Sequence, residues 1–144
     1  MKKTKGFSLV ELLVVVAILA IISAIAYPMY ANYTIRAACD NGKAGLMQAD
    51  ALMNQYYIKY GSYSNDDVKD GLVIKVIPID GSSNTADFTV SLVNTVTTYT
   101  ITATATSTGR LKKYAGSTMT VNQSGTKTSN FNGIDVWTQG CSSL

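Results

Sequence analysis

The chain has 144 residues, enough for one domain, and carries 12 basic against 9 acidic side chains. Three of the basic residues precede Gly6, so the rest of the chain is neutral overall and is not a general polyanion binder. The sequence contains no histidine, the commonest general base and metal ligand, and no nucleophile–base pair, phosphate-cradling glycine loop or metal-ligand spacing. We therefore expect a protein that is not an enzyme and that has no cofactor or metal site.

The chain opens with three lysines and an apolar run from Phe7 to Tyr27. As a helix this run is about 31 Å long, enough to span a bilayer core, and the lysines place its start on the cytoplasmic side. Ala24-Ile25-Ala26 has the small-x-small form of a signal peptidase site, so a cleaved secretory signal and a plain single-pass anchor are alternatives. Neither explains Glu11, which needs a partner because a lone carboxylate in hydrocarbon costs about 2.5–3.5 kcal/mol.

The stretch Gly6-Phe7-Ser8-Leu9-Val10-Glu11 resembles the class III signal of type IV pilins and of the related type II secretion pseudopilins. The resemblance implies that a prepilin peptidase cuts after Gly6 and methylates the new amino terminus, Phe7, so that residues 1–6 are a cleaved leader. It also implies that Glu11 serves subunit assembly by pairing with the cationic Phe7 amine of a neighbouring subunit in low dielectric. In the alternative, the Glu11 side chain has no such partner and extends to the lipid headgroups near the start of the helix.

The resemblance continues at Tyr27-Pro28, where these proteins often have a proline kink and aromatic residues. Pro28 lacks an N–H and clashes with the preceding turn, so we expect it to kink or locally break the helix. Ala20 departs from the family, because many pilins have a helix-weakening glycine there. We expect residues 7–33 to form the transmembrane and filament-core half of the helix, and residues 34–144 to form a globular head.

Beyond Pro28 the sequence still has a helical pattern, with apolar residues at steps of three and four along one face. We expect this face to pack on a sheet and the helix to stop at Gly61, ahead of the polar loop 62–67. The predicted face consists of Ile35, Cys39, Gly42, Leu46, Ala49, Met53, Tyr56 and Tyr60.

Four predicted strands follow, Leu72–Ile79, Asp87–Val93, Thr98–Thr106 and Thr118–Val121, and then a loop-rich tail. Apolar residues alternate with serine and threonine along the second and third strands, so one face should pack on the helix while the other is a threonine surface. The sequence thus predicts an α+β protein with a long N-terminal α-helix packed on a four-stranded antiparallel sheet, which is the type IV pilin fold.

Cys39 and Cys141 are the only cysteines, and they lie too far apart for a redox or zinc motif. Because an exported chain folds in an oxidising compartment, we expect them to form one structural disulfide, with two unpaired thiols as the alternative. The bridge requires the tail to fold back beside the helix. In many type IV pilins the disulfide instead encloses a carboxy-terminal loop, so the variable-loop role is not carried over.

After residue 100 the chain has four basic residues and a single acid, Asp135. The basic residues are Arg110, Lys112, Lys113 and Lys127. Since some pilins take up DNA through a positive strip on the head, these four are candidate DNA contacts. The alternative is a solvated rim that keeps a sheet edge from aggregating.

A cluster of acids, Asp66, Asp67 and Asp70, resembles the calcium-binding loop of the major pseudopilins only in composition. It lacks the alternating oxygen ligands and the terminal bidentate glutamate of an EF-hand loop. We therefore expect a solvated acidic loop and no metal site.

These features together predict a structural subunit, minor rather than major, of a type IV pilus that serves adhesion, twitching motility or DNA uptake. A pseudopilin of a type II secretion system and a DNA-binding pilin receptor for natural transformation are the alternatives. The expected partners are other pilin subunits, the prepilin peptidase, the inner-membrane assembly platform and the lipid bilayer before assembly, with DNA as a further candidate. We expect the protein first in the inner membrane with its head in the periplasm, then in the extracellular pilus (fimbrium).

Overall fold

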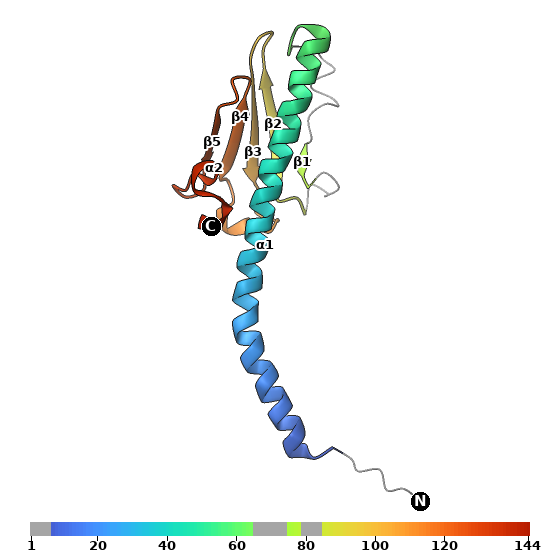
Figure 1. Cartoon of the computed structure of the whole chain (residues 1–144), viewed down its shortest axis with the longest axis vertical. Coiled ribbons are helices and arrows are strands. Elements are labelled where there is room, and N and C mark those ends of the chain that lie inside the picture. The colour runs from blue at the N-terminus through green and yellow to red at the C-terminus, as the bar shows by residue number, and fades with distance from the viewer. Residues whose placement is uncertain (1–6, 65–74, 79–84) are drawn as a thin grey trace, which may run out of the picture. The chain divides into compact units, whose positions relative to one another are not determined.

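The computed structural model describes residues 7–64, 75–78 and 85–144, and its elements are labelled in Figure 1. The chain divides into two compact units, Met1–Tyr33 and Thr34–Leu144. One long helix, α1 (Leu9–Tyr60), begins in the first unit and ends in the second. The acidic loop of the sequence analysis, residues 66–70, lies outside the described residues.

The first half of α1 is apolar on all sides. Its large aliphatic side chains, from Leu9 to Ile25, are 48–75% exposed. The helix is long and apolar enough to cross a membrane, and an 18-residue window of it has a mean hydropathy of 2.9. The helix runs through Pro28 without interruption, so the predicted alternative of a local break is wrong. A proline removes only its own hydrogen bond to the carbonyl four residues earlier, and the turns on either side keep theirs. The kink stays a prediction.

The second half of α1 buries one face, as the periodicity predicts. Its buried residues are Ala38, Cys39, Gly42, Gly45, Leu46, Ala49, Met53 and Tyr56. A Cβ atom on Gly42 would collide with Met119 and Phe88, so this turn of the helix packs directly on the sheet. Tyr60 departs from the predicted face, because it lies in the last turn and is 47% exposed. The helix ends there, and Gly61 follows with a positive φ of 68°, as expected of a helix stop.

Within the part of the chain that the structure describes, the sheet has five antiparallel strands in the order β1-β2-β3-β4-β5. Figure 1 labels each of them. They are β1 (Val76–Ile77), β2 (Phe88–Asn94), β3 (Tyr99–Ala105), β4 (Thr118–Asn122) and β5 (Lys127–Asn130). The predicted count of four is therefore wrong by one strand. The residues of β5, Lys-Thr-Ser-Asn, show no apolar alternation, so the sequence pattern assigns them to the tail. As an edge strand it is held by its pairing with β4 and buries little of its own surface.

The two faces of the sheet differ as predicted. Phe88, Ile101 and Val121 are fully buried in the core against α1. The other face has rows of hydroxyl-bearing residues, because the register pairs Ser91 with Thr102 and Thr102 with Thr120. It extends to the edge, where the hydroxyl oxygens of Thr120 and Thr128 lie 2.7 Å apart. A threonine surface needs no cover, since each hydroxyl can bond to water or to its neighbour.

The tail folds back beside the helix, as the predicted disulfide requires. It contains α2 (Val136–Gln139) and a 3-10 turn, η3 (Cys141–Ser143). Cys39 and Cys141 form a disulfide, with 5.8 Å between their Cα atoms and 102 residues of sequence separation. The predicted pairing is confirmed, and it links the buried face of α1 to the end of the chain.

Candidate nucleic-acid interface and amino-terminal signal

Lys112 and Lys113 occupy the exposed middle of a turn whose two ends are buried. The turn is η2 (Lys112–Tyr114), a 3-10 helix between β3 and β4. Leu111 before it is fully buried and Tyr114 at its end is 5% exposed, which matches the i to i+3 spacing that puts two side chains on one face of a 3-10 helix. The two lysines between them point to solvent, and the Lys113 Nζ lies 5.2 Å from the centroid of the Tyr114 ring. We call these two residues the η2 lysine pair.

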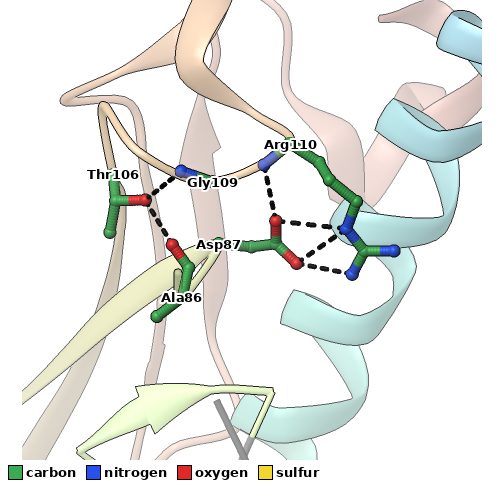
Figure 2. A network of polar contacts seen from close by, with 5 residues as sticks. All are labelled: Ala86, Asp87, Thr106, Gly109 and Arg110. Atoms are coloured by element: carbon green, nitrogen blue, oxygen red, sulfur yellow. Dashed lines mark hydrogen bonds and ion pairs between the residues drawn. The ribbon is translucent and has the colours of Figure 1, made fainter. Parts of the chain in front are cut away.

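The structure places Arg110 in a different role from the lysines beside it. Its guanidinium forms an ion pair with Asp87, which is 1% exposed, and the Nη2–Oδ2 distance is 2.5 Å (Figure 2). The Arg110 Nε also lies 3.1–3.2 Å from both carboxylate oxygens. The positive charge of Arg110 is therefore matched by a buried negative one, whereas the sequence alone grouped it with three uncompensated lysines.

Lys127 lies near the only tryptophan of the chain. The Lys127 Nζ, on β5, is 5.5 Å from the centroid of the Trp137 ring, and the Nζ of Lys43, on α1, is 5.7 Å from the same centroid. Trp137 is partly exposed and donates its Nε1–H to the carbonyl oxygen of Thr128 at 3.1 Å. Lys43, Lys127 and Trp137, the tryptophan cluster, thus combine two cations with an aromatic ring.

Sequence reasoning missed Lys43 and Trp137. The helical periodicity placed Lys43 off the packed face, and Trp137 lay in a tail without a pattern. The signal available was that this chain has a single tryptophan, in a region with a net positive charge. Only the return of the tail beside α1 brings the two residues together.

An acid fixes the position of Trp137. Asp135 caps α2, and its Oδ1 accepts hydrogen bonds from the Trp137 N–H at 3.1 Å and the Ser129 hydroxyl at 2.5 Å. The Ser129 hydrogen bond, with those of the Trp137 N–H and Thr138, lowers the pKa of Asp135 from its ordinary value. The carboxylate therefore stays charged and keeps capping α2 at neutral pH.

The two cationic groups lie at opposite ends of the β4–β5 ladder. β4 starts at Thr118, just after the η2 turn, and Lys127 pairs with Val121 near the other end of β4. At about 3.3 Å per residue, Thr118 and Val121 lie on the order of 10 Å apart along the strand. Beside the η2 lysine pair lies a shallow polar depression of about 440 Å³, which is lined by Ala115, Gly116, Ser117, Asn130, Asn132 and Gly133.

At the start of α1, Glu11 has a hydrogen-bond partner within its own chain. The Ser8 N–H donates to the Glu11 Oε2 at 2.9 Å, and the Val10 N–H donates to the Ser8 hydroxyl at 3.3 Å. This is a capping box, which satisfies two of the backbone donors that a helix start leaves unpaired. The pattern Ser-x-x-Glu ahead of an apolar run, from Ser8 to Glu11, is the sequence signature of such a cap.

Within the described ranges, 7–64, 75–78 and 85–144, no three histidine, cysteine, aspartate or glutamate side chains gather into a metal-binding group. The lysines and aromatic rings described above offer cationic and aromatic contacts, and the depression beside the η2 lysine pair adds amide and backbone groups.

Comparison with known protein families covers almost the whole of this chain. Residues 1–27 match the prokaryotic N-terminal methylation motif, and residues 28–130 match the family described as type IV minor pilin ComP, DNA uptake sequence receptor. The chain belongs to this family. The class III signal and the pilin resemblance that the sequence predicted are thereby confirmed, and the family is structural rather than enzymatic.

Individual relatives agree with this assignment. The type IV major pilin protein PilE of Neisseria gonorrhoeae is 29% identical over 99 residues, which cover 62% of this chain and 59% of PilE. A fimbrial protein of Pseudomonas aeruginosa is 58% identical over 36 residues, 25% of this chain and 23% of the relative. The chain thus spans less than two thirds of the length of these curated relatives. They are proteins of pili and fimbriae, which favours a pilus over the secretion-system alternative.

A solved structure shows the fold. The crystal structure of the Neisseria meningitidis non-core minor pilin PilV is similar with a TM-score of 0.54 at 18% identity, covering 72% of this chain and 93% of PilV. The pilin fold predicted from the sequence is confirmed, with five strands in place of four.

Proposed function

We propose that this minor pilin enters a type IV pilus as a structural subunit and that its head binds DNA. The observation that carries the DNA role is the η2 lysine pair, two adjacent exposed cations on a turn held at both ends by buried residues. Membership of a family described as a DNA uptake sequence receptor supports this role. Adhesion and twitching motility are the other uses of a pilus that the assignment allows.

The tryptophan cluster adds a second group of contacts. Lys43 and Lys127 can neutralise phosphates, and the exposed part of the Trp137 ring can stack on a base or a sugar. Each neutralised phosphate of duplex DNA contributes about −0.9 to the slope of log K against log salt concentration. Binding by the η2 lysine pair alone predicts a slope of about −1.8, and binding by both groups about −3.6.

The amino-terminal segment carries the proposal on assembly. A prepilin peptidase would cut after Gly6 and leave a methylated amine on Phe7, and a neighbouring subunit would offer Glu11 to that amine. Before assembly the apolar half of α1 would lie in the inner membrane with the head in the periplasm, where the assembly platform extracts it. The Ser8 N–H offers Glu11 a hydrogen bond in the meantime, which lowers the cost of holding it there.

Mass spectrometry of the protein purified from membranes tests the processing step. The expected mature chain starts at N-methylated Phe7. A mature chain that starts near Tyr27 would show an ordinary signal peptide and exclude the assembly role proposed for Glu11.

Fluorescence anisotropy tests the DNA role. The full-length chain in non-ionic detergent is titrated onto a short labelled DNA duplex of mixed sequence over a series of salt concentrations. Replacing Lys112 and Lys113 by alanine should reduce the magnitude of the salt slope by about 1.8 and weaken binding.

The matched control is the double alanine variant of Lys59 and Lys75. It removes the same net charge from two exposed lysines outside both cationic groups. If this control lowers the slope as much as the alanine variant of the η2 lysine pair, the binding reflects net charge alone and the proposed site is wrong.

A further inference from the structure

Asp87 carries a buried carboxylate and lies one residue before β2. It is 1% exposed, and its backbone is fixed by two hydrogen bonds: Asp87 N–H to the Ile77 carbonyl at 2.8 Å, and Thr106 N–H to the Asp87 carbonyl at 2.9 Å. An unpaired buried carboxylate is strongly destabilising, so the side chain needs a fixed cationic partner. The role of Asp87 therefore depends on which residue is its partner and on where that residue lies.

The partner is the backbone and the side chain of one residue, Arg110. The Arg110 N–H donates to the Asp87 Oδ1 at 2.8 Å, and the guanidinium contacts both carboxylate oxygens (Figure 2). Asp87 therefore fixes the backbone of Arg110 as well as its charge. A two-oxygen contact of this kind also fixes the direction of the guanidinium plane.

A second tether lies one residue before Arg110. The Gly109 N–H donates to the Thr106 hydroxyl at 3.0 Å, and that hydroxyl donates to the Ala86 carbonyl (Figure 2). A Cβ atom on Gly109 would lie 2.6 Å from the Ala86 carbonyl oxygen and the Asp87 Cα, so only glycine permits this approach. The loop after β3 is thus attached to the start of β2 at two consecutive residues.

The η2 lysine pair lies between this attachment and a third one. After the lysines, the Gly116 N–H donates to the Ala105 carbonyl at 2.9 Å, and the Ser117 N–H donates to the Tyr114 carbonyl at 2.9 Å. Lys112 itself is tied back, since its N–H donates to the Gly109 carbonyl at 3.2 Å. The backbone of the two lysines is therefore held from both sides, although their side chains are in solvent.

We propose that Asp87 and Arg110 are positioning residues for DNA binding: their ion pair holds the turn that presents Lys112 and Lys113, and Arg110 itself does not contact phosphate. The proposal rests on the DNA role proposed above. It has a physical basis in preorganisation, because a turn that is ordered before binding has less conformational freedom to lose when the phosphates dock.

The first test replaces Arg110 by lysine in the full-length chain. A lysine keeps the positive charge but loses the two-oxygen contact with Asp87, since an ammonium is a point donor. The expected result is a DNA affinity about three- to tenfold lower at an unchanged salt slope. Wild-type affinity would overturn the proposal, because a lysine serves as well as an arginine for a simple phosphate contact.

The second test removes the ion pair with no change in net charge, by Asp87→Asn with Arg110→Gln. We expect weaker binding to the same labelled duplex, again by about three- to tenfold, with the slope unchanged. A slope smaller in magnitude by about 0.9 would show that Arg110 neutralises a phosphate and would overturn the proposal. Unchanged affinity and slope would overturn it as well.

Amide hydrogen exchange separates positioning from general loss of stability. Exchange at the amides of Lys112 and Tyr114, which donate to the Gly109 and Leu111 carbonyls, should become faster in both variants, while the amides of β3 and β4 away from the turn keep their wild-type rates. Uniformly faster exchange over the whole head would show a merely structural role and contradict the proposal. If the double variant does not fold, the DNA affinity of the Arg110→Lys variant alone tests the positioning role.

The alanine variant of the η2 lysine pair distinguishes the two proposals. If it lowers the slope while the ion-pair variants bind like the wild type, the site is correct and the positioning role is wrong. If it binds like the wild type, the DNA role of this turn fails first, and the positioning role fails with it.

Discussion

The two halves of helix α1 use apolar residues in opposite ways. Between Leu9 and Ile25 apolar side chains cover the whole circumference, and the chain itself buries none of them. Between Ala38 and Tyr56 they form one stripe, and that stripe is buried. The apolar stripe of the second half is buried by other residues of the same chain, whereas the apolar surface of the first half needs lipid or other helices around it. One helix therefore connects a unit stabilised by its own core to a segment stabilised only by its surroundings.

The largest expected effect concerns the first half. Glu11→Gln keeps the capping box, because glutamine can accept the same hydrogen bond from the Ser8 N–H, but it removes the charge. We expect the variant to be made, cleaved and held in the membrane normally. Its content in sheared filaments should fall by about a hundredfold or more, because the incoming amine of a neighbour would be buried without its counter-charge.

Quantitative immunoblots of membrane and sheared-filament fractions measure this effect. Ser8→Ala is the matched control, since it removes the hydroxyl of the capping box and leaves the Glu11 charge. Incorporation of the Gln variant at wild-type levels would show that the charge is dispensable and that capping is the whole role of Glu11.

The next effect concerns the second half and its link to the tail. Reducing the Cys39–Cys141 disulfide opens a loop closed over 102 residues of sequence separation, which should lower the free energy of unfolding of the head by about 4–5 kcal/mol. The melting temperature should fall by on the order of 20 °C, as measured by circular dichroism with and without reductant. Reductant should leave membrane residence unchanged. An unchanged melting temperature together with two titratable thiols in the oxidised protein would contradict the bridge.

A smaller effect compares two substitutions in the same helix. Gly42→Ala inserts a methyl group against Met119 and Phe88 and should lower the free energy of unfolding by about 1–3 kcal/mol. Asn41→Ala, one residue earlier on the exposed side, should leave it within about 0.5 kcal/mol. Chemical denaturation measures both. Equal stability of the two variants would show that α1 does not pack on the sheet at Gly42.

The smallest effect is a dependence on alkaline pH. Tyr99 is 1% exposed and donates its hydroxyl to the Asp50 Oδ1 at 2.5 Å; burial, then this hydrogen bond, raises the pKa of Tyr99. A pKa raised in the folded state contributes stability that is present below the unfolded value of about 10 and is lost as the pH rises above it. Stability should therefore decline above about pH 10, and less steeply in Tyr99→Phe. Identical pH profiles by chemical denaturation would contradict this assignment.

The amino-acid sequence by itself determined the features that depend on near neighbours. The apolar run after Gly6, the stripe from Cys39 to Tyr56, the stop at Gly61 and the alternation along β2 and β3 are all local patterns. Each pattern shows which side of a helix or strand is apolar. That side can therefore be predicted as buried without knowing which residues pack against it. The same holds for Ser8 and Glu11, whose capping contact spans only three residues.

Only the tertiary structure decided the features that depend on distant partners. β5 has no apolar pattern and exists through its pairing with β4. Trp137 meets Lys43 because the tail returns to the helix. Arg110 stands beside lysines in the sequence, yet Asp87, 23 residues earlier, neutralises it. Charge composition counts side chains, but strand register and chain return decide which charges face each other, and therefore which of them remain available to a ligand.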